Sequence, residues 1–341
     1  MKTVVITNFQ QTYAEILTDF DPASFTEEWS LNNQWQIQFS VIKTPKNAFA
    51  FDLISHESTM SFNEQIFVIK QMTTKAIGGT IQKDVTALHI YFTMQDVFKH
   101  ETRSGKLSIS ACLSHLLDAN DSGFTWGTVG EFTSVEQENF GAKNLLDGCM
   151  EVMKDYDAVM VADNKHLTFY ARDQYGAKTG KYIRYRYNTD DMQAQVDTTQ
   201  LKTRIKGFGK QKENGSYYFA PVTYTSEQAK KWGIREATPI TDERMTNQAS
   251  MSAKLARELQ DYPTISLSTS LKRDQPVKKG EYWVIVYEPM GLKIDTQLVG
   301  YKQYPFTSTP PEITLSNEKA TILDIQVQLA KDIKRWRGAK P

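Results

Sequence analysis

Alternation of apolar and polar residues is the feature that most constrains how this chain can fold. In "WQIQFSV", residues 35–41, every second side chain is apolar, which is the period of a β-strand with one buried face. The apolar members are Trp35, Ile37, Phe39 and Val41. A register slip of one residue would move this whole set into water. The chain must therefore fold around sheets that bury one face.

Further strands are expected within the first hundred residues. "IFVI", residues 66–69, is apolar on both faces and predicts a central strand, and "LHIYFTM", residues 88–94, predicts a second strand. One face of that second strand would carry Leu88, Ile90, Phe92 and Met94. "IGGT", residues 77–80, predicts the turn between them. Residues 1–104 are expected to form one strand-rich domain.

The period then changes from two to between three and four. Two amphipathic helices are expected, with inner faces made of Ile109, Cys112, Leu113, Leu116 and Leu117, and of Ala142, Leu145, Leu146, Cys149, Met150 and Met153. The polar and glycine-containing residues 118–130 predict a loop between the helices, and residues 157–170 predict a strand, a turn and a strand. Residues 105–172 are thus expected to form a small α/β domain.

Strand patterns return in the second half of the chain. They occur at 181–188, 199–209, 217–224, 264–271, 282–288, 292–304 and 311–317. We expect a second strand-rich domain from residues 173–225 and 262–316, interrupted by a helical insertion at 226–261. Ala249, Ala256 and Leu259 would face inward on that helix. Residues 317–341 predict a C-terminal helix, so the fold class is α+β and β-rich.

Composition excludes several function classes. Forty Lys and Arg balance forty Asp and Glu, so no overall field draws the chain to nucleic acid or to an anionic membrane. No apolar run approaches the roughly 20 residues of a membrane span, and the N-terminal apolar run is too short for a signal peptide. Two cysteines cannot make a zinc set. We expect synthesis in a cytosol, without metal or cofactor.

The basic stretch "TRIKGFGK", residues 203–210, raises the possibility of a phosphate loop. Such a loop needs Gly-Lys-Ser/Thr at the start of a helix, whereas Gln211 follows Lys210 and another strand pattern comes next. The stretch therefore predicts scaffold, a strand in which Gly207 and Gly209 would allow a bulge or a sharp bend.

A basic and aromatic face is expected nearby. It comprises Tyr182, Arg184 and Arg186 on one strand and Lys202 and Lys206 on the next. Interleaved basic and aromatic residues can bind nucleic acid. The neutral total favours instead a solvated face or one that pairs with an acidic neighbouring subunit. We treat these five residues as a candidate interface.

No catalytic constellation emerges. Cys112 and His115 are spaced to touch on a helix, but Cys112 and Cys149 both lie within apolar stripes, which favours core packing over reactivity. The sequence has no GxSxG nucleophile motif. The Asp190-Asp191 pair has no second motif that would supply partners for a general acid and base. The sequence therefore predicts no enzyme.

Three stretches together carry a family resemblance. "EQIFVIKQM" at 64–72, "DVTALHIYFTM" at 84–94 and "TRIKGFGK" at 203–210 resemble the prophage endopeptidase tail family. These are tail-tip hub proteins, or tail-associated lysins, of phages that infect Gram-positive bacteria. "EITLSNEKATILDIQ" is similar to the end of that family. The matching residues are architectural: Phe67, Val68, Ile69, Lys70, Thr203, Arg204, Ile205, Gly209 and Lys210.

The resemblance implies a baseplate hub with two tube-like β-barrel or sandwich domains and smaller mixed insertions. Such hubs are homotrimers that close a sixfold tail tube. The implied partners are the distal tail, tail tube and tape-measure proteins and receptor-binding or tip proteins, with DNA only in transit through the lumen. The implied location is the virion tail tip, after synthesis in the bacterial host cytoplasm.

Two alternatives remain open at this point. One is a tail-associated peptidoglycan endopeptidase, as the family name suggests, and the other is a cell-wall carbohydrate-binding module that uses exposed Trp and Tyr. In larger relatives the wall-degrading or host-binding modules lie C-terminal to the hub, whereas this chain stops at Pro341. We therefore expect no endopeptidase activity from these residues.

Overall fold

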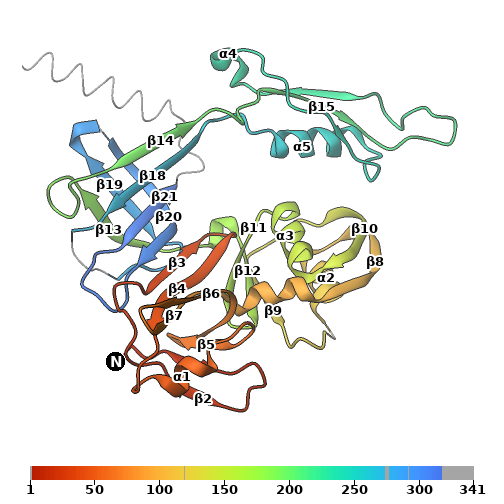
Figure 1. Cartoon of the computed structure of the whole chain (residues 1–341). Coiled ribbons are helices and arrows are strands. Elements are labelled where there is room, and N and C mark those ends of the chain that lie inside the picture. Colours follow the sequence, from red (N-terminus) through yellow and green to blue (C-terminus); the bar gives the residue numbers. More distant parts are fainter. Residues whose placement is uncertain (1, 119, 273–275, 291, 317–341) are drawn as a thin grey trace, which may run out of the picture.

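The computed structural model describes residues 2–118, 120–272, 276–290 and 292–316. Figure 1 shows four parts: a first block (residues 2–96), a small domain (97–172), a second block (173–200 and 262–316) and a projecting arm (201–261). The C-terminal helix expected at 317–341 lies outside the described residues.

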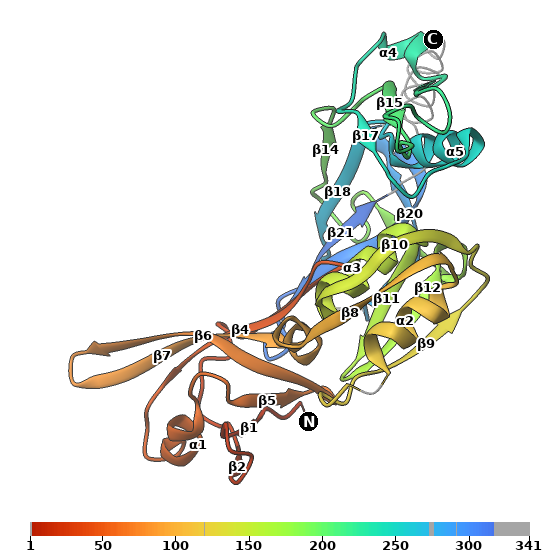
Figure 2. The same cartoon turned by 90° about the vertical axis from the view of Figure 1, so that its right-hand side faces the viewer.

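The first block is antiparallel sheet with one short helix. Its elements are β1 (Val5–Thr7), β2 (Ala14–Ile16), β3 (Thr26–Ser30), β4 (Gln34–Ile42), α1 (Ala48–Leu53), β5 (Thr59–Phe62), β6 (Gln65–Ile77), β7 (Thr80–His89) and the 3-10 helix η1 (Ile90–Asp96). The alternation at 35–41 is confirmed, because all four of its apolar side chains are buried. β6 lies between β5 and β7, as expected for a central strand. Gly78 and Gly79, both with positive φ, turn β6 into β7, and this long hairpin projects from the molecule in Figure 2.

The strand expected at 88–94 is wrong beyond His89. Residues Ile90–Asp96 form η1 instead, because local hydrogen bonds compete with the ladder there. The His89 ring accepts from the backbone N–H of Tyr91 at 3.3 Å, and the Thr93 hydroxyl donates to the carbonyl of Ile90 at 2.8 Å. The apolar alternation of this segment is thus compatible with a short 3-10 turn.

The small domain combines two helices with five strands. Its elements are β8 (Phe98–Leu107), α2 (Ile109–Leu117), β9 (Thr125–Val129), β10 (Val135–Asn144), α3 (Leu145–Asp155), β11 (Ala158–Asp163) and β12 (His166–Ala171). Both expected helices exist, but Ala142 belongs to β10 with φ 49°, and Asn144 caps α3 by accepting from the N–H of Asp147. The expected loop at 118–130 contains β9, which pairs parallel to β12. Tertiary pairing there overrides the loop-like composition.

The second block joins the first through backbone hydrogen bonds between paired strands. Its elements are the 3-10 helix η2 (Arg172–Gln174), β13 (Lys178–Arg184), β14 (Gln193–Asp197), β18 (Thr264–Ser270), β19 (Tyr282–Tyr287), the 3-10 helix η3 (Glu288–Met290), β20 (Leu292–Gln303) and β21 (Glu312–Ser316). β20 pairs with β3, so strands of both blocks form one 13-stranded sheet. Buried Glu27 on β3 accepts from Trp35 on β4 and from Tyr301 and Gln303 on β20, and the last two bonds join the two blocks.

The arm has its own sheet and its own core. Its elements are β15 (Arg204–Phe208), β16 (Val222–Thr225), α4 (Ala229–Trp232), β17 (Ile240–Thr241) and α5 (Gln248–Glu258). β15 pairs with β16 and β17 and with no other described strand, although residues 199–225 were expected to join the second block. Strand periodicity specifies a face but not a partner. The domain boundaries proposed from the sequence stay a prediction.

The buried face of α5 also differs from expectation. Met251, Leu255 and Leu259 are buried against the arm sheet, whereas Ala249 and Ala256 are exposed. The prediction is therefore correct for Leu259 and wrong for the two alanines, because the larger side chains of Met251 and Leu255 bury more apolar area. This small core is separate from the large one that runs through both blocks and the small domain.

Candidate functional site

The "TRIKGFGK" stretch forms part of the arm scaffold. The Thr203 hydroxyl is buried, donates to the carbonyl of Gly233 at 2.7 Å and accepts from the N–H of Arg235 at 2.8 Å. Arg204 donates to Thr225 and lies 3.3 Å from Glu236, and Ile205 is buried in the arm core. Lys210 is exposed and β15 is not followed by a helix, so the geometry of a phosphate loop is not present here.

Both glycines of the stretch serve close packing. A Cβ on Gly207 would lie 2.7 Å from Sδ of Met251 and 2.9 Å from Leu255, and one on Gly209 would lie 2.5 Å from the carbonyl oxygen of Met245. β15 pairs with β16 in continuous register from Arg204 to Gly207, so there is no bulge at Gly207, and neither glycine has positive φ. Instead, Gly207 lets α5 pack closely on β15, and Gly209 lets the backbone at Met245 approach the residues just after β15.

The "FVIK" stretch positions the large core. Phe67, Val68 and Ile69 are buried on β6. The pairing of β6 with β7 shifts register between Ile69 and Gln71, and Lys70 in this bulge reaches Glu57 at 2.9 Å and Asp96 at 3.6 Å. The family-motif residues thus lie in two different parts of the molecule.

The five residues of the candidate interface do not share one face. Tyr182 and Arg184 are exposed on β13, where Arg184 pairs with Glu288 at 2.9 Å. Arg186 lies beyond the strand in a turn with φ 62°, and Tyr187 beside it stacks on Tyr182 with ring centroids 5.8 Å apart. Lys202 and Lys206 belong to the arm.

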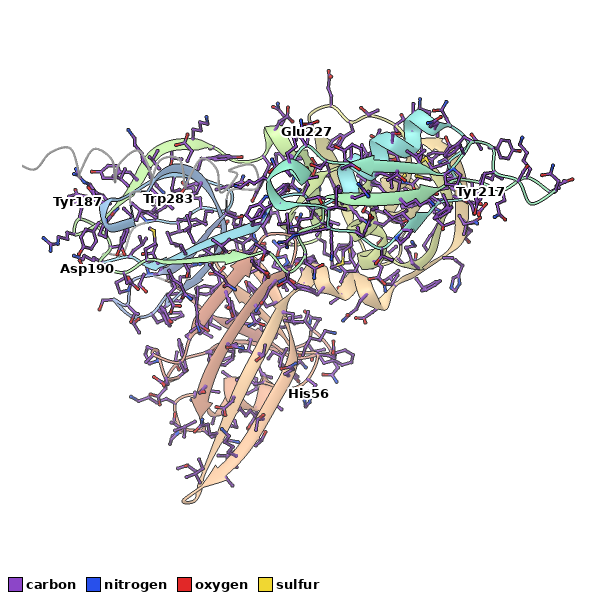
Figure 3. All side chains as sticks on the ribbon, turned by 90° about the horizontal axis from the view of Figure 1, so that it is seen from above. His56, Tyr187, Asp190, Tyr217, Glu227 and Trp283 are labelled. Atoms are coloured by element: carbon purple, nitrogen blue, oxygen red, sulfur yellow. The ribbon has the colours of Figure 1, made fainter. Side chains whose placement is uncertain are left out.

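Figure 3 shows how far apart these parts lie. Tyr187, at the β13 end, and Tyr217, which contacts Phe208 on β15 at 5.8 Å between centroids, are at opposite ends of the view. The structure therefore offers two separate basic and aromatic surfaces instead of a single strip. Whether either is an interface stays a prediction.

The cysteines are core residues, as expected. Cys112 and Cys149 are fully buried, and burial raises the pKa of Cys112 and raises that of Cys149 to about 12. The Cys112 sulfur lies 3.3 Å from the Tyr156 hydroxyl. His115 bonds through Nε2 to the carbonyl of Glu101 at 2.9 Å. Such protonated thiols are poor nucleophiles.

Metal ligands and membrane-spanning helices can be assessed for the described residues. Among them, no group of three or more His, Cys, Asp or Glu could hold a metal ion. No helix in the described part of the chain is long and apolar enough to cross a membrane.

A cleft lies between the arm, the small domain and the second block. Its volume is about 1180 Å³, and most of the residues that line it are polar or carry charges of either sign. Side chains from three elements line it: Gln137 on β10, Asp155 at the end of α3, and Lys254 and Arg257 on α5. Arg244, between β17 and α5, also lines it.

A hydrogen-bonded ion cluster lies along this cleft. Arg244 donates through Nη1 to Gln137 at 3.1 Å and lies 3.9 Å from Asp155, while Gln137 donates to Asp155 at 2.8 Å. Within the arm, Arg244 bonds to Asp242 at 2.8 Å, and Lys254 also pairs with Asp242. Burial would raise the pKa of Asp242, but the bonds from Arg244 and Lys254 lower it to about 2.

Sequence reasoning missed this cluster. Arg244 and Gln137 are 107 residues apart, and neither lies in a motif. The only local signal is the "TDER" stretch, 241–244, whose Asp and Arg are close enough to pair in a turn. Contact with the small domain is a property of the tertiary structure.

Comparisons with known proteins agree over most of the chain. Three family models match: the prophage endopeptidase tail N-terminal domain at residues 4–89, the prophage endopeptidase tail domain at 96–169 and the prophage endopeptidase tail at 177–326. None of the curated proteins compared with the sequence matches it.

Solved structures give the same result. The prophage tail protein gp18 from Listeria monocytogenes is 43% identical, with 97% of this chain and 99% of that chain covered and a TM-score of 0.75. A tail protein from Neisseria meningitidis is 9% identical, with coverage of 93% and 96% and a TM-score of 0.64. A 43 kDa tail protein of prophage MuSo2 from Shewanella oneidensis is 9% identical, with coverage of 93% and 99% and a TM-score of 0.66. These last two share the fold. With its three parts matched in order, the chain belongs to the prophage endopeptidase tail family.

Proposed function

We propose that the protein is a structural subunit of a phage tail, and specifically the homotrimeric hub that closes the tail tube at its tip. Family membership and the fold shared with tail proteins support the structural role. The trimer, the tail-tip position and the partners are the finer part of the proposal. Those partners would be the distal tail, tail tube and tape-measure proteins and host-contacting tip proteins.

The open edges of the large sheet are the observation that carries this proposal. The large sheet has three edge strands, β14, β2 and β13, and every residue of β14 and β2 is exposed. An unpaired edge is a template for pairing with another chain unless it is protected. Several open edges on one sheet suit a subunit that repeats around a ring.

Charge is also unevenly distributed along the chain. Residues 1–172 contain 13 Lys and Arg against 21 Asp and Glu, whereas residues 173–341 contain 27 against 19. The two halves therefore carry net charges of −8 and +8 at neutral pH. Opposite net charge on the two halves of the chain favours attraction between unlike parts of neighbouring copies.

No observation favours a wall-degrading enzyme. The family name contains the word endopeptidase, yet Cys112 is buried beside Tyr156 and His115 is hydrogen-bonded to the carbonyl of Glu101. A protein whose work is assembly needs complementary surfaces and no activated nucleophile. We also propose that the exposed residues Tyr182 and Arg184 on β13 contact a neighbouring subunit.

Sedimentation velocity of the full chain over a range of concentrations tests the proposal. We expect a monomer–trimer equilibrium, and three copies arranged in a ring when isolated tail tips are imaged. A chain that stays monomeric at high concentration and is missing from the tip would refute it. Release of peptides from purified peptidoglycan would instead support the enzymatic alternative.

A further inference from the structure

The arm is joined to the rest of the molecule at two places of different character. At its base the chain enters after β14 and leaves into β18, and half-buried Trp232 packs against the large core. At the other side α5 faces the small domain across the cleft (Figure 1). The two blocks and the small domain together form the body of the molecule, and its core is separate from the core of the arm.

The contacts described between α5 and the small domain are polar. Arg257 donates to the carbonyl of Asp155 at 3.3 Å, and Lys154 pairs with Glu258 at 3.1 Å. Arg244 joins them through Gln137 and Asp155. Four residues of this seam are mostly buried: the side chains of Asp155, Asp242, Lys254 and Arg244 are 5–16% exposed.

Net charge has the sign that such a seam needs. The arm contains 11 Lys and Arg against 7 Asp and Glu, and the small domain contains 7 against 11. The two parts therefore attract each other across the cleft. Polar contacts of this kind are directional and can be broken without exposing an apolar core, unlike the packing inside each part.

We propose that the arm is a hinged element held over the cleft by this seam, which acts as an electrostatic latch. The hinge lies at the two chain crossings between the second block and the arm. Release of the latch opens the cleft and leaves both cores intact. The inference does not depend on the proposed trimer, because every contact it uses lies within one chain.

A charge swap across the seam tests the latch directly. Lys154 and Glu258 form a pair whose members lie on opposite sides, so Lys154→Glu and Glu258→Lys each replace attraction by repulsion. We expect each single change to lower the ratio of closed to open arm by about tenfold, and the double change to restore it. Asp155→Asn is a third variant, on the body side alone.

The readout is the distance between spin labels on the full chain. Thr223→Cys on β16 and Thr102→Cys on β8 provide exposed labelling sites away from the seam, and burial protects Cys112 and Cys149 from labelling. We expect one narrow distance in the parent protein and a second, longer population in the single variants. Lys230→Glu is the matched control, because Lys230 pairs with Glu227 inside the arm.

Amide exchange at Met251 and Leu255 shows whether the arm stays folded. If Lys154→Glu or Glu258→Lys unfolds the arm, these amides lose their protection from exchange. The distance distribution of Asp155→Asn then tests the latch in its place. An unchanged distance in all seam variants, or a distribution already broad in the parent protein, would overturn the proposal. A control variant that opens the arm as far as Glu258→Lys would do so as well.

Discussion

The junction between the two blocks and the junction between the arm and the small domain are built from different chemistry. At the first, β3 and β20 share backbone hydrogen bonds, and Trp29 packs on Tyr301 with centroids 5.6 Å apart. At the second, the described contacts are side-chain hydrogen bonds and ion pairs. A shared ladder and core make two parts unfold together, whereas polar contacts allow them to separate.

Truncation of the body core should have the largest effect. Trp283 on β19 is fully buried and donates to Glu281 at 3.1 Å. We expect Trp283→Ala to lower the free energy of unfolding by about 3–5 kcal/mol, because it leaves a cavity. Denaturant unfolding followed by circular dichroism measures this loss. Amide protection in the arm should persist. If the arm loses its protection together with the body, the two parts do not unfold separately.

The second largest effect is expected from acid, which should lower the stability of the first block. His89 is fully buried and stacks on Trp35 at 4.0 Å between ring centroids. Burial, with a contribution from Lys279, lowers the pKa of His89 to about 3. The unfolded chain takes up this proton near pH 6.5, so stability falls as the pH drops from 6.5 toward 3.

The contribution of His89 to this loss should be roughly 2–4 kcal/mol. Comparison with His89→Gln isolates it from the carboxylates that titrate in the same range. The difference in unfolding free energy between the two proteins should shrink as the pH falls. A constant difference from pH 7 to pH 3.5 would show that His89 is not held neutral in the fold.

A methyl group on the arm strand should have a smaller and local effect. Gly207→Ala places a Cβ 2.7 Å from Met251, and we expect a loss of about 1–3 kcal/mol confined to the arm. Gly127→Ala is the matched control, since the nearest atom to its Cβ would be 3.8 Å away. Amide exchange resolves the two regions. Equal effects of both substitutions would argue against close packing of α5 on β15.

The smallest effect on stability is expected at the exposed end of β13. Arg184 and Glu288 form a solvent-exposed pair, so Arg184→Glu should leave the melting temperature of the monomer unchanged. If this surface contacts another subunit, the same change should weaken self-association in sedimentation velocity. Normal association by the variant would remove Arg184 from the proposed interface.

Several local features were predictable because their cause is local. The alternation of apolar residues at 35–41 defines the buried face of β4 wherever β4 pairs. The spacing of Leu113, Leu116 and Leu117 likewise defines the buried face of α2. Where local hydrogen bonding or a distant partner competed, as in η1 and β9, the pattern alone gave the wrong element.

The sequence by itself determined which side chains are buried on most strands, the inert character of the cysteines and the family to which the chain belongs. Only the tertiary structure decided that β3 pairs with β20, that β15 leaves the large sheet, and that Arg244 meets Asp155. Periodicity is encoded by neighbours along the chain, whereas strand partners and ion pairs bring together residues separated by long loops. Many such pairings satisfy the same local pattern, and the packing of the whole molecule selects one of them.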